Sequence, residues 1–285
     1  MAALTSELEY LGGPVSTHIQ SAEMGNQAVN SLALISGRYA VRAIDTLQQL
    51  LAYSLYLLCQ ALDLRALQRA IALKLHKEIE ASISKFFSTW INGDDQKSLA
   101  VRVYARLQKR LEETSARDLQ SRLLEGYMVS GFELLSYFAN LPSGGGADPL
   151  RTIMAWRAES AKETEALFRK TTLRHLETPR ACHASPLLGK TRPLYEFIRR
   201  QLGVGMHGLD NFHEFRNDPD QKQSNSATTS GAGSGVGATF QKTPTIGQNV
   251  SVILASLRNG DLYKVMHEAL VDVKRSTTGP IKQKL

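Results

Sequence analysis

Cysteine is scarce in this 285-residue chain, which contains only Cys59, within an apolar run, and Cys182, in a basic segment. Two isolated cysteines cannot form the disulfide framework that is typical of small secreted proteins. The opening residues, MAALTSELEY, also lack the basic and apolar regions of a secretory signal peptide. These absences predict a reducing, intracellular setting, and we expect a cytoplasmic protein.

A long hydrophobic run is lacking as well. The most apolar stretch, residues 50–62 (LLAYSLYLLCQAL), is shorter than the ~20 apolar residues of a membrane-spanning helix. Gln48, Gln49, Gln60 and Asp63 lie in or beside it. We therefore interpret it as a buried core helix and expect no membrane partner.

The basic balance, a formal charge of +7 and a pI near 9.4, is compatible with nucleic-acid binding. However, the sequence lacks a zinc-finger spacing, a recognisable helix-turn-helix and an aromatic-rich sheet motif. We interpret the densest basic segment as an ordinary solvated surface and expect no nucleic-acid partner. That segment spans residues 169–200 and includes Lys170, Arg174, Arg180, Lys190, Arg192 and Arg199.

Metal and phosphate motifs are absent too. His175, Cys182 and His183 match no zinc spacing and lack a fourth ligand, so we expect no metal. The glycine-rich GAGSGVGAT satisfies neither phosphate-binding fingerprint, and no strand precedes it. Since residues 221–239 contain one charge and no aromatic residue, we predict a flexible low-complexity insertion over 205–242.

Apolar residues recur at helical spacing along almost the whole sequence. The sequence shows no convincing strand and no internal repeat, so the predicted class is all-α. We expect Asp148 to cap a helix that begins with Pro149, and Gly203 to end a short helix that begins at Pro193. The expected helical segments are 28–62, 71–87, 99–111, 119–134, 150–175, 193–202, 250–257 and 262–270.

Residues 20–36, QSAEMGNQAVNSLALIS, read as the start of a helix in which Glu23, Asn26, Gln27 and Asn30 share one side. An unpaired buried carboxylate costs several kcal/mol, so this polar stripe predicts a pocket wall or a compensating cation. A second interpretation fits equally well: Ser21 caps an exposed first turn, where acidic residues are favoured.

The segment TSELEYLGGPVSTHIQSAEMGNQAVNSLALIS resembles phenylalanine ammonia-lyases, especially the fungal ones. The resemblance continues in LLCQALDLRAL, TRPLYEFIRRQLGV and TIGQNVSVILASLRNGDL. It implies an all-α fold with a central bundle of long helices and a peripheral helical arch, here without the N-terminal half. On that basis residues 1–68 belong to the bundle and carry the pocket segment, 69–186 form the arch, and 187–204 and 243–272 return to the bundle.

Members of that family convert L-phenylalanine, and some L-tyrosine, to trans-cinnamate or coumarate plus ammonia, within a homotetramer. The resemblance implies that Glu23 faces the substrate amino group as the catalytic residue. It also places Asn26 in the substrate site and Gln27 beside the aromatic ring. Histidine-specific relatives usually carry a carboxylate where this chain has Gln27, so an amide there favours phenylalanine or tyrosine.

The family's electrophile is a methylidene-imidazolone group formed from an internal Ala-Ser-Gly, and this sequence contains no such tripeptide. We therefore expect the C-terminal portion of a lyase, inactive alone, that forms a homo-oligomer or associates with a full-length lyase. The alternative is a non-catalytic helical protein that assembles with, or regulates, such a lyase.

Overall fold

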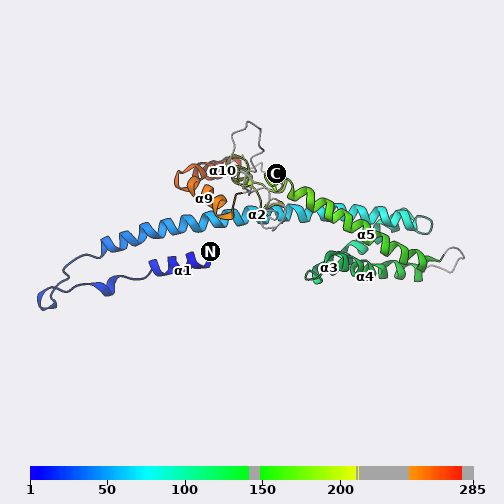
Figure 1. Ribbon diagram of the computed structural model, residues 1–285, viewed down its shortest axis with the longest axis horizontal. Helices are drawn as coiled ribbons and strands as arrows, with labels where there is room; N and C mark the ends of the chain where they lie inside the picture. Colours follow the sequence, from blue (N-terminus) through cyan, green and yellow to red (C-terminus); the bar gives the residue numbers. More distant parts are fainter. Residues whose placement is uncertain (141–147, 210, 212–243, 278–285) are drawn as a thin grey trace, which may run out of the picture. The chain divides into compact units, whose positions relative to one another are not determined.

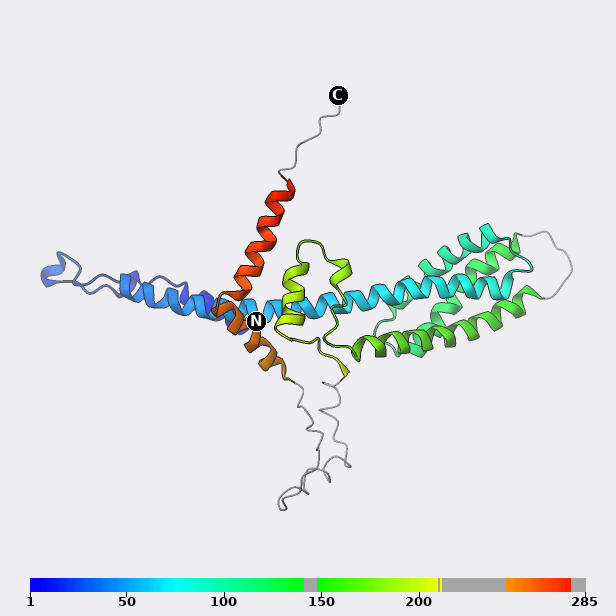
Figure 2. The same cartoon turned by 90° about the horizontal axis from the view of Figure 1, so that it is seen from above.

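The computed structural model describes residues 1–140, 148–209, 211 and 244–277 (Figures 1 and 2). The described residues form helices joined by loops and contain no strand, only an isolated antiparallel bridge between Ser21 and Ala28, so the predicted all-α class is confirmed. The chain divides into two compact units, which we call unit 1 (Met1–Leu64 with Glu177–Leu285) and unit 2 (Arg65–Leu176).

Unit 2 is built from four helical segments that lie side by side, as both views show (Figures 1 and 2). They are the C-terminal part of α2 (Ala33–Phe87), α3 (Gly93–Glu113), α4 (Leu119–Ala139) and α5 (Pro149–Leu176). Apolar side chains at helical spacing meet in one core because each helix has a single apolar face. The core includes Ile79, Ile83, Leu99, Val103, Leu107, Leu123, Leu134 and Ile153.

Aromatic rings and two buried hydrogen bonds hold the centre of unit 2. Trp156 is fully buried, packs edge-on against Tyr127, and donates from Nε1 to Ser82 Oγ at 3.1 Å. The Tyr127 hydroxyl and Thr164 Oγ1 are 2.7 Å apart. These bonds satisfy polar groups that would otherwise destabilise a buried site.

The helices of unit 2 begin where short polar side chains accept backbone hydrogen bonds. Asn92 accepts from the Asp95 amide at 2.8 Å, and Asp118 accepts from the Ser121 amide at 2.9 Å. Asp148 accepts from the Leu150 amide at 3.0 Å, which confirms it as the cap before Pro149. Such side chains satisfy amides that the first helical turn leaves without an intrahelical partner.

Unit 1 contains α1 (Ala2–Leu11), the N-terminal part of α2, α6 (Arg192–Glu196), α9 (Ile246–Arg258) and α10 (Asp261–Thr277). A π-helical turn, Phe197–Gln201, follows α6 directly, and Gly203 with φ of +68° comes after it. The short helix from Pro193 is thus confirmed, while its wide last turn was not predicted. A capping box of Thr245 and Gln248 opens α9.

Helix α2 differs from the prediction in two ways. It joins the expected segments 28–62 and 71–87 into one helix of 55 residues, and it begins at Ala33 rather than near Gln20. By length and composition it is the one helix in the described ranges that could cross a membrane. This match is weak evidence, because the core helix of a soluble protein passes the same test.

The predicted burial of residues 50–62 holds for only one face of α2. Ala52, Tyr56 and Cys59 are buried, whereas Leu57 and Leu58 are more than half exposed. The interpretation of residues 50–62 as a buried core helix therefore holds for one face only, because the elements of unit 1 cover one side of this helix. The roles assigned to residues 1–68, 69–186, 187–204 and 243–272 stay predictions. Residues 210 and 212–242 of the predicted insertion lie outside the described residues.

Candidate functional site

The segment between α1 and α2 folds back on itself as a short hairpin. The Ala22 amide donates to the Gln27 carbonyl at 2.8 Å, and the Val29 amide donates to the Gln20 carbonyl at 2.8 Å. At the tip, Met24 and Gly25 have φ values of 59° and 69°, and Glu23–Gly25 forms one 3₁₀ turn. We call residues 20–29 the polar hairpin.

The polar hairpin corrects the predicted helical stripe. Glu23, Asn26, Gln27 and Asn30 all precede α2, and all four are exposed. Two successive left-handed residues cannot belong to a right-handed helix, and glycine permits that conformation at low cost. The first three residues are close because of the turn and not because of helical spacing.

The second interpretation, a helix capped by Ser21, is also wrong. Ser21 lies in the bridge with Ala28, and at the start of α2 the Ala33 amide donates to Ser31 Oγ at 3.2 Å. His18 lies outside the hairpin, in the separate 3₁₀ turn Ser16–His18.

The hairpin presents one carboxylate and two amides from a single tight turn. No described side chain forms an ion pair with Glu23, and none bonds to the side chains of Asn26 or Gln27. A carboxylate can pair with an ammonium group, and amides offer both donors and acceptors without charge. The arrangement can therefore contact a group that carries a positive charge, with the amides forming hydrogen bonds beside it.

Unit 1 contains a second polar cluster, which was not predicted from the sequence. Arg199 and Asp63 are fully buried, and Arg199 Nη2 donates to Asp63 Oδ2 at 2.6 Å. Tyr195 donates its hydroxyl to Asp63 Oδ1, and Arg199 Nη1 donates to the Val204 carbonyl at 3.0 Å. Burial and the bond to Asp63 raise the pKa of Tyr195. The cluster ties the π-helical turn to α2 and has a structural role.

Arg199 therefore does not belong to the solvated basic surface, a correction to the sequence interpretation. The other named cations of that segment, Lys170, Arg174, Arg180, Lys190 and Arg192, are exposed as expected. Asp63 was the available signal, because a carboxylate within an apolar run needs a buried partner.

Within the part of the chain that the structure describes, the cysteines and histidines form no metal-ligand group. Cys59 is 4% exposed, and burial is the main cause that raises its pKa to about 11. His183 Nε2 lies 3.1 Å from both Thr178 Oγ1 and the Thr178 carbonyl, and Cys182 is half-buried. Over the described ranges, no three His, Cys, Asp or Glu side chains group as metal ligands would.

Comparison with known proteins decides the relationship of the chain. Residues 1–85, which include the polar hairpin, match the family model described as aromatic amino acid lyase. The chain is 48% identical over 268 residues to a phenylalanine ammonia-lyase from Mycosarcoma maydis, covering 94% of this chain and 34% of that protein. The chain is similar to part of an aromatic amino acid lyase.

Two further proteins show the same partial similarity. A phenylalanine ammonia-lyase from Flammulina velutipes is 38% identical, with 96% of this chain and 35% of the relative covered. A crystal structure of phenylalanine ammonia-lyase from Rhodosporidium toruloides matches with a TM-score of 0.70 and 31% identity, covering 94% of this chain and 37% of that one. The chain thus spans about a third of the length of the relatives that it matches.

Proposed function

We propose that this chain contributes the amino-group side of the substrate pocket to an aromatic amino acid ammonia-lyase. The reaction would be the non-oxidative elimination of ammonia from L-phenylalanine, giving trans-cinnamate. The observation that carries the proposal is the 48% identity to a phenylalanine ammonia-lyase over nearly the whole chain. The exposed carboxylate and amides of the polar hairpin support it.

In this proposal the Glu23 carboxylate pairs with the ammonium group of the substrate. It then accepts a proton from that group, which becomes a neutral amine before ammonia is eliminated. Asn26 and Gln27 add hydrogen-bonding groups without adding charge. A neutral amide at position 27 favours the neutral ring of phenylalanine or tyrosine over imidazole. The ring therefore lies beside Gln27 and the amino group beside Glu23.

The methylidene-imidazolone implied by the family does not fit the residues present. That group is built from Ala-Ser-Gly, and this tripeptide does not occur in the 285-residue sequence. If this chain takes part in elimination, a separate stretch of polypeptide supplies the electrophile.

Reconstitution tests the proposal. The chain is produced alone and together with the part of the Mycosarcoma maydis enzyme that it does not match, and cinnamate is followed by ultraviolet absorbance. We expect no product from the chain alone and product from the soluble complex. The Glu23→Gln variant should lower the rate of the complex about 100-fold, within the range for lost proton transfer by a side chain.

Glu9→Gln is the matched control, because Glu9 is an exposed carboxylate on α1 with no ion pair in the described structure. It should leave the rate unchanged. A soluble complex that makes no cinnamate, or one that keeps full activity with Glu23→Gln, would contradict the proposal. Cinnamate from the chain alone would contradict the separate origin of the electrophile.

A second candidate function is non-catalytic association with an intact lyase, in assembly or regulation. The missing tripeptide favours it, as does the exposed apolar face of α2. Mixing the chain with an intact fungal lyase and measuring particle mass by sedimentation distinguishes the two. A change in mass and rate that survives Glu23→Gln supports this second function, and an unchanged particle argues against it.

A further inference from the structure

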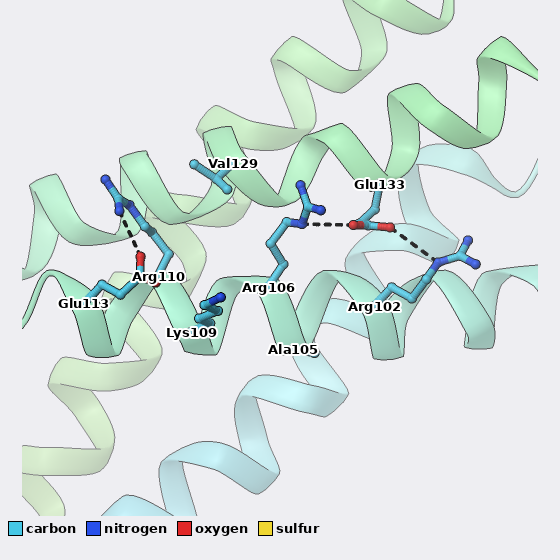
Figure 3. A pocket seen from close by; sticks show the side chains of 8 residues that line it. All are labelled: Arg102, Ala105, Arg106, Lys109, Arg110, Glu113, Val129 and Glu133. Atoms are coloured by element: carbon cyan, nitrogen blue, oxygen red, sulfur yellow. Dashed lines mark hydrogen bonds and ion pairs between the residues drawn. The ribbon is translucent and has the colours of Figure 1, made fainter.

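A cationic groove of about 530 Å³ runs between α3 and α4 in unit 2 (Figure 3). Its volume lies within the range of small-molecule sites in proteins. Arg102, Arg106, Lys109 and Arg110 line one wall from successive turns of α3. At the ~1.5 Å rise per residue of an α-helix, these four cations extend over about 12 Å. The remaining lining residues are Ala105, Glu113, Val129 and Glu133.

Glu133 holds two of the arginines in a defined orientation. Its Oε1 lies 2.9 Å from Arg106 Nε, and its Oε2 lies 3.5 Å from Arg102 Nε. The Glu133 side chain is only 19% exposed, whereas the two arginines are about half exposed. Both contacts use Nε, and Figure 3 shows the terminal nitrogens of Arg102 directed away from Glu133. The guanidinium ends are thus positioned in advance for an acceptor, which reduces the ordering cost of binding.

Lys109 and Arg110 supply the positive charge at the other end of the groove. Within the described structure Lys109 is exposed and forms no ion pair. Arg110 pairs with Glu113 at 2.9 Å and with Glu125, but its buried Nε has no acceptor among the described residues. The lining contains four cations and two carboxylates, which leaves two formal positive charges.

We propose that the groove binds a compact polyphosphate group. Guanidinium forks match phosphate oxygens in pairs, and lysine adds a point charge. Several cations along about 12 Å suit linked phosphates better than one isolated anion. No aromatic ring lines the groove, so a nucleobase would find no stacking surface there. The recognised chemistry is therefore the phosphate chain, whether inorganic or part of a nucleotide.

Isothermal titration of the full chain with inorganic tripolyphosphate, ATP and sulfate at about 0.15 M salt tests the proposal. We expect saturable binding of tripolyphosphate, comparable binding of ATP, and much weaker binding of sulfate. Lys109→Gln and Arg106→Gln should each weaken tripolyphosphate binding about tenfold, the effect of losing one charge-assisted hydrogen bond.

Lys97→Gln is the matched control, because Lys97 is an exposed cation on the same helix that does not line the groove. It should leave the affinity unchanged, and circular dichroism confirms that each variant stays helical. Equal weakening by Lys97→Gln and Lys109→Gln, or no saturable binding at about 0.15 M salt, overturns the proposal. The readout needs no lyase activity, so it is independent of the proposed function.

Discussion

Arg199 and Asp63 form an ion pair from which water is excluded, with Nη2 and Oδ2 2.6 Å apart and both side chains fully buried. Replacing Asp63 with alanine would leave a buried guanidinium without its counter-charge. We expect Asp63→Ala to lower the free energy of unfolding by about 3–5 kcal/mol. Urea denaturation followed by far-ultraviolet circular dichroism measures this loss.

The double variant Asp63→Leu with Arg199→Met removes both charges and keeps apolar volume. It should recover most of the stability lost in Asp63→Ala, because isosteric apolar replacements of buried ion pairs are often neutral. An Asp63→Ala variant as stable as the parent chain would show that the pair is not closed to water.

Gly126 lies in the interior of α4, where its backbone approaches Leu107 of α3. A Cβ added there would lie 2.4 Å from Leu107 Cδ1, so alanine forces the two helices apart or shifts Leu107. Gly→Ala in a helix normally stabilises by up to ~1 kcal/mol. We expect Gly126→Ala to destabilise unit 2 by about 1–3 kcal/mol, as overpacked cores do.

Tryptophan fluorescence during urea denaturation measures this effect in unit 2 alone, because the two tryptophans of the chain, Trp90 and Trp156, both lie there. Gly93→Ala is the control, since nothing lies within 4 Å of a Cβ at that position. A Gly126→Ala variant as stable as the control would contradict the close approach of α3 and α4.

Cys59 gives the fold a defined pH dependence. Its pKa is raised from 9.0 to about 11 in the folded chain, so the thiol stays neutral there while the unfolded chain ionises it. Stability from this group is complete below pH 9 and is lost as the pH rises to about 11. Cys59→Ala should flatten the decline of unfolding free energy over that window.

Thiol labelling gives a direct check on Cys59. With iodoacetamide at neutral pH, we expect the half-buried Cys182 to react while Cys59 stays protected, because the thiolate is the nucleophile and burial restricts access. Mass spectrometry of peptides distinguishes the two. Equal labelling rates in the folded chain would contradict the burial of Cys59.

The exposed face of α2 should bind a hydrophobic dye. Leu57 and Leu58 are 51% and 59% exposed, within a longer apolar stripe on this helix. We expect fluorescence of 8-anilinonaphthalene-1-sulfonate to rise on mixing, and a Leu57→Lys, Leu58→Lys variant to reduce it clearly. Leu124→Lys, at a leucine of unit 2 that is also 51% exposed, should change it little. An unchanged signal in the double variant would place the dye elsewhere.

The sequence predicted most of the helices because apolar period and capping residues act locally. Asp148 before Pro149 and Gly203 after the short helix are such signals, and both positions are as expected. It failed at the start of α2, because polar residues at helical spacing do not reveal that Met24 and Gly25 are left-handed. A dihedral angle of this kind depends on the whole turn.

Contacts between residues far apart in the chain could not be predicted from the sequence either. Arg199 was grouped with surface cations because its partner, Asp63, is 136 residues away. Arg102 and Arg106 lie on α3, but Glu133, which pairs with both of them, comes from α4. The role of Glu23 in catalysis, the roles of Asn26 and Gln27, and cytoplasmic residence stay predictions.

The polar hairpin also makes Glu23 a natural point for specific cleavage. Residues 12–32 contain no lysine or arginine, and Glu23 is their one acidic residue. Trypsin therefore cannot cut between α1 and α2 there, whereas a glutamate-specific protease meets one exposed bond at the tip of a tight turn. Anything that covers the carboxylate would slow that single cut. The rate at which α1 is released thus reports occupancy of Glu23 without any catalytic assay.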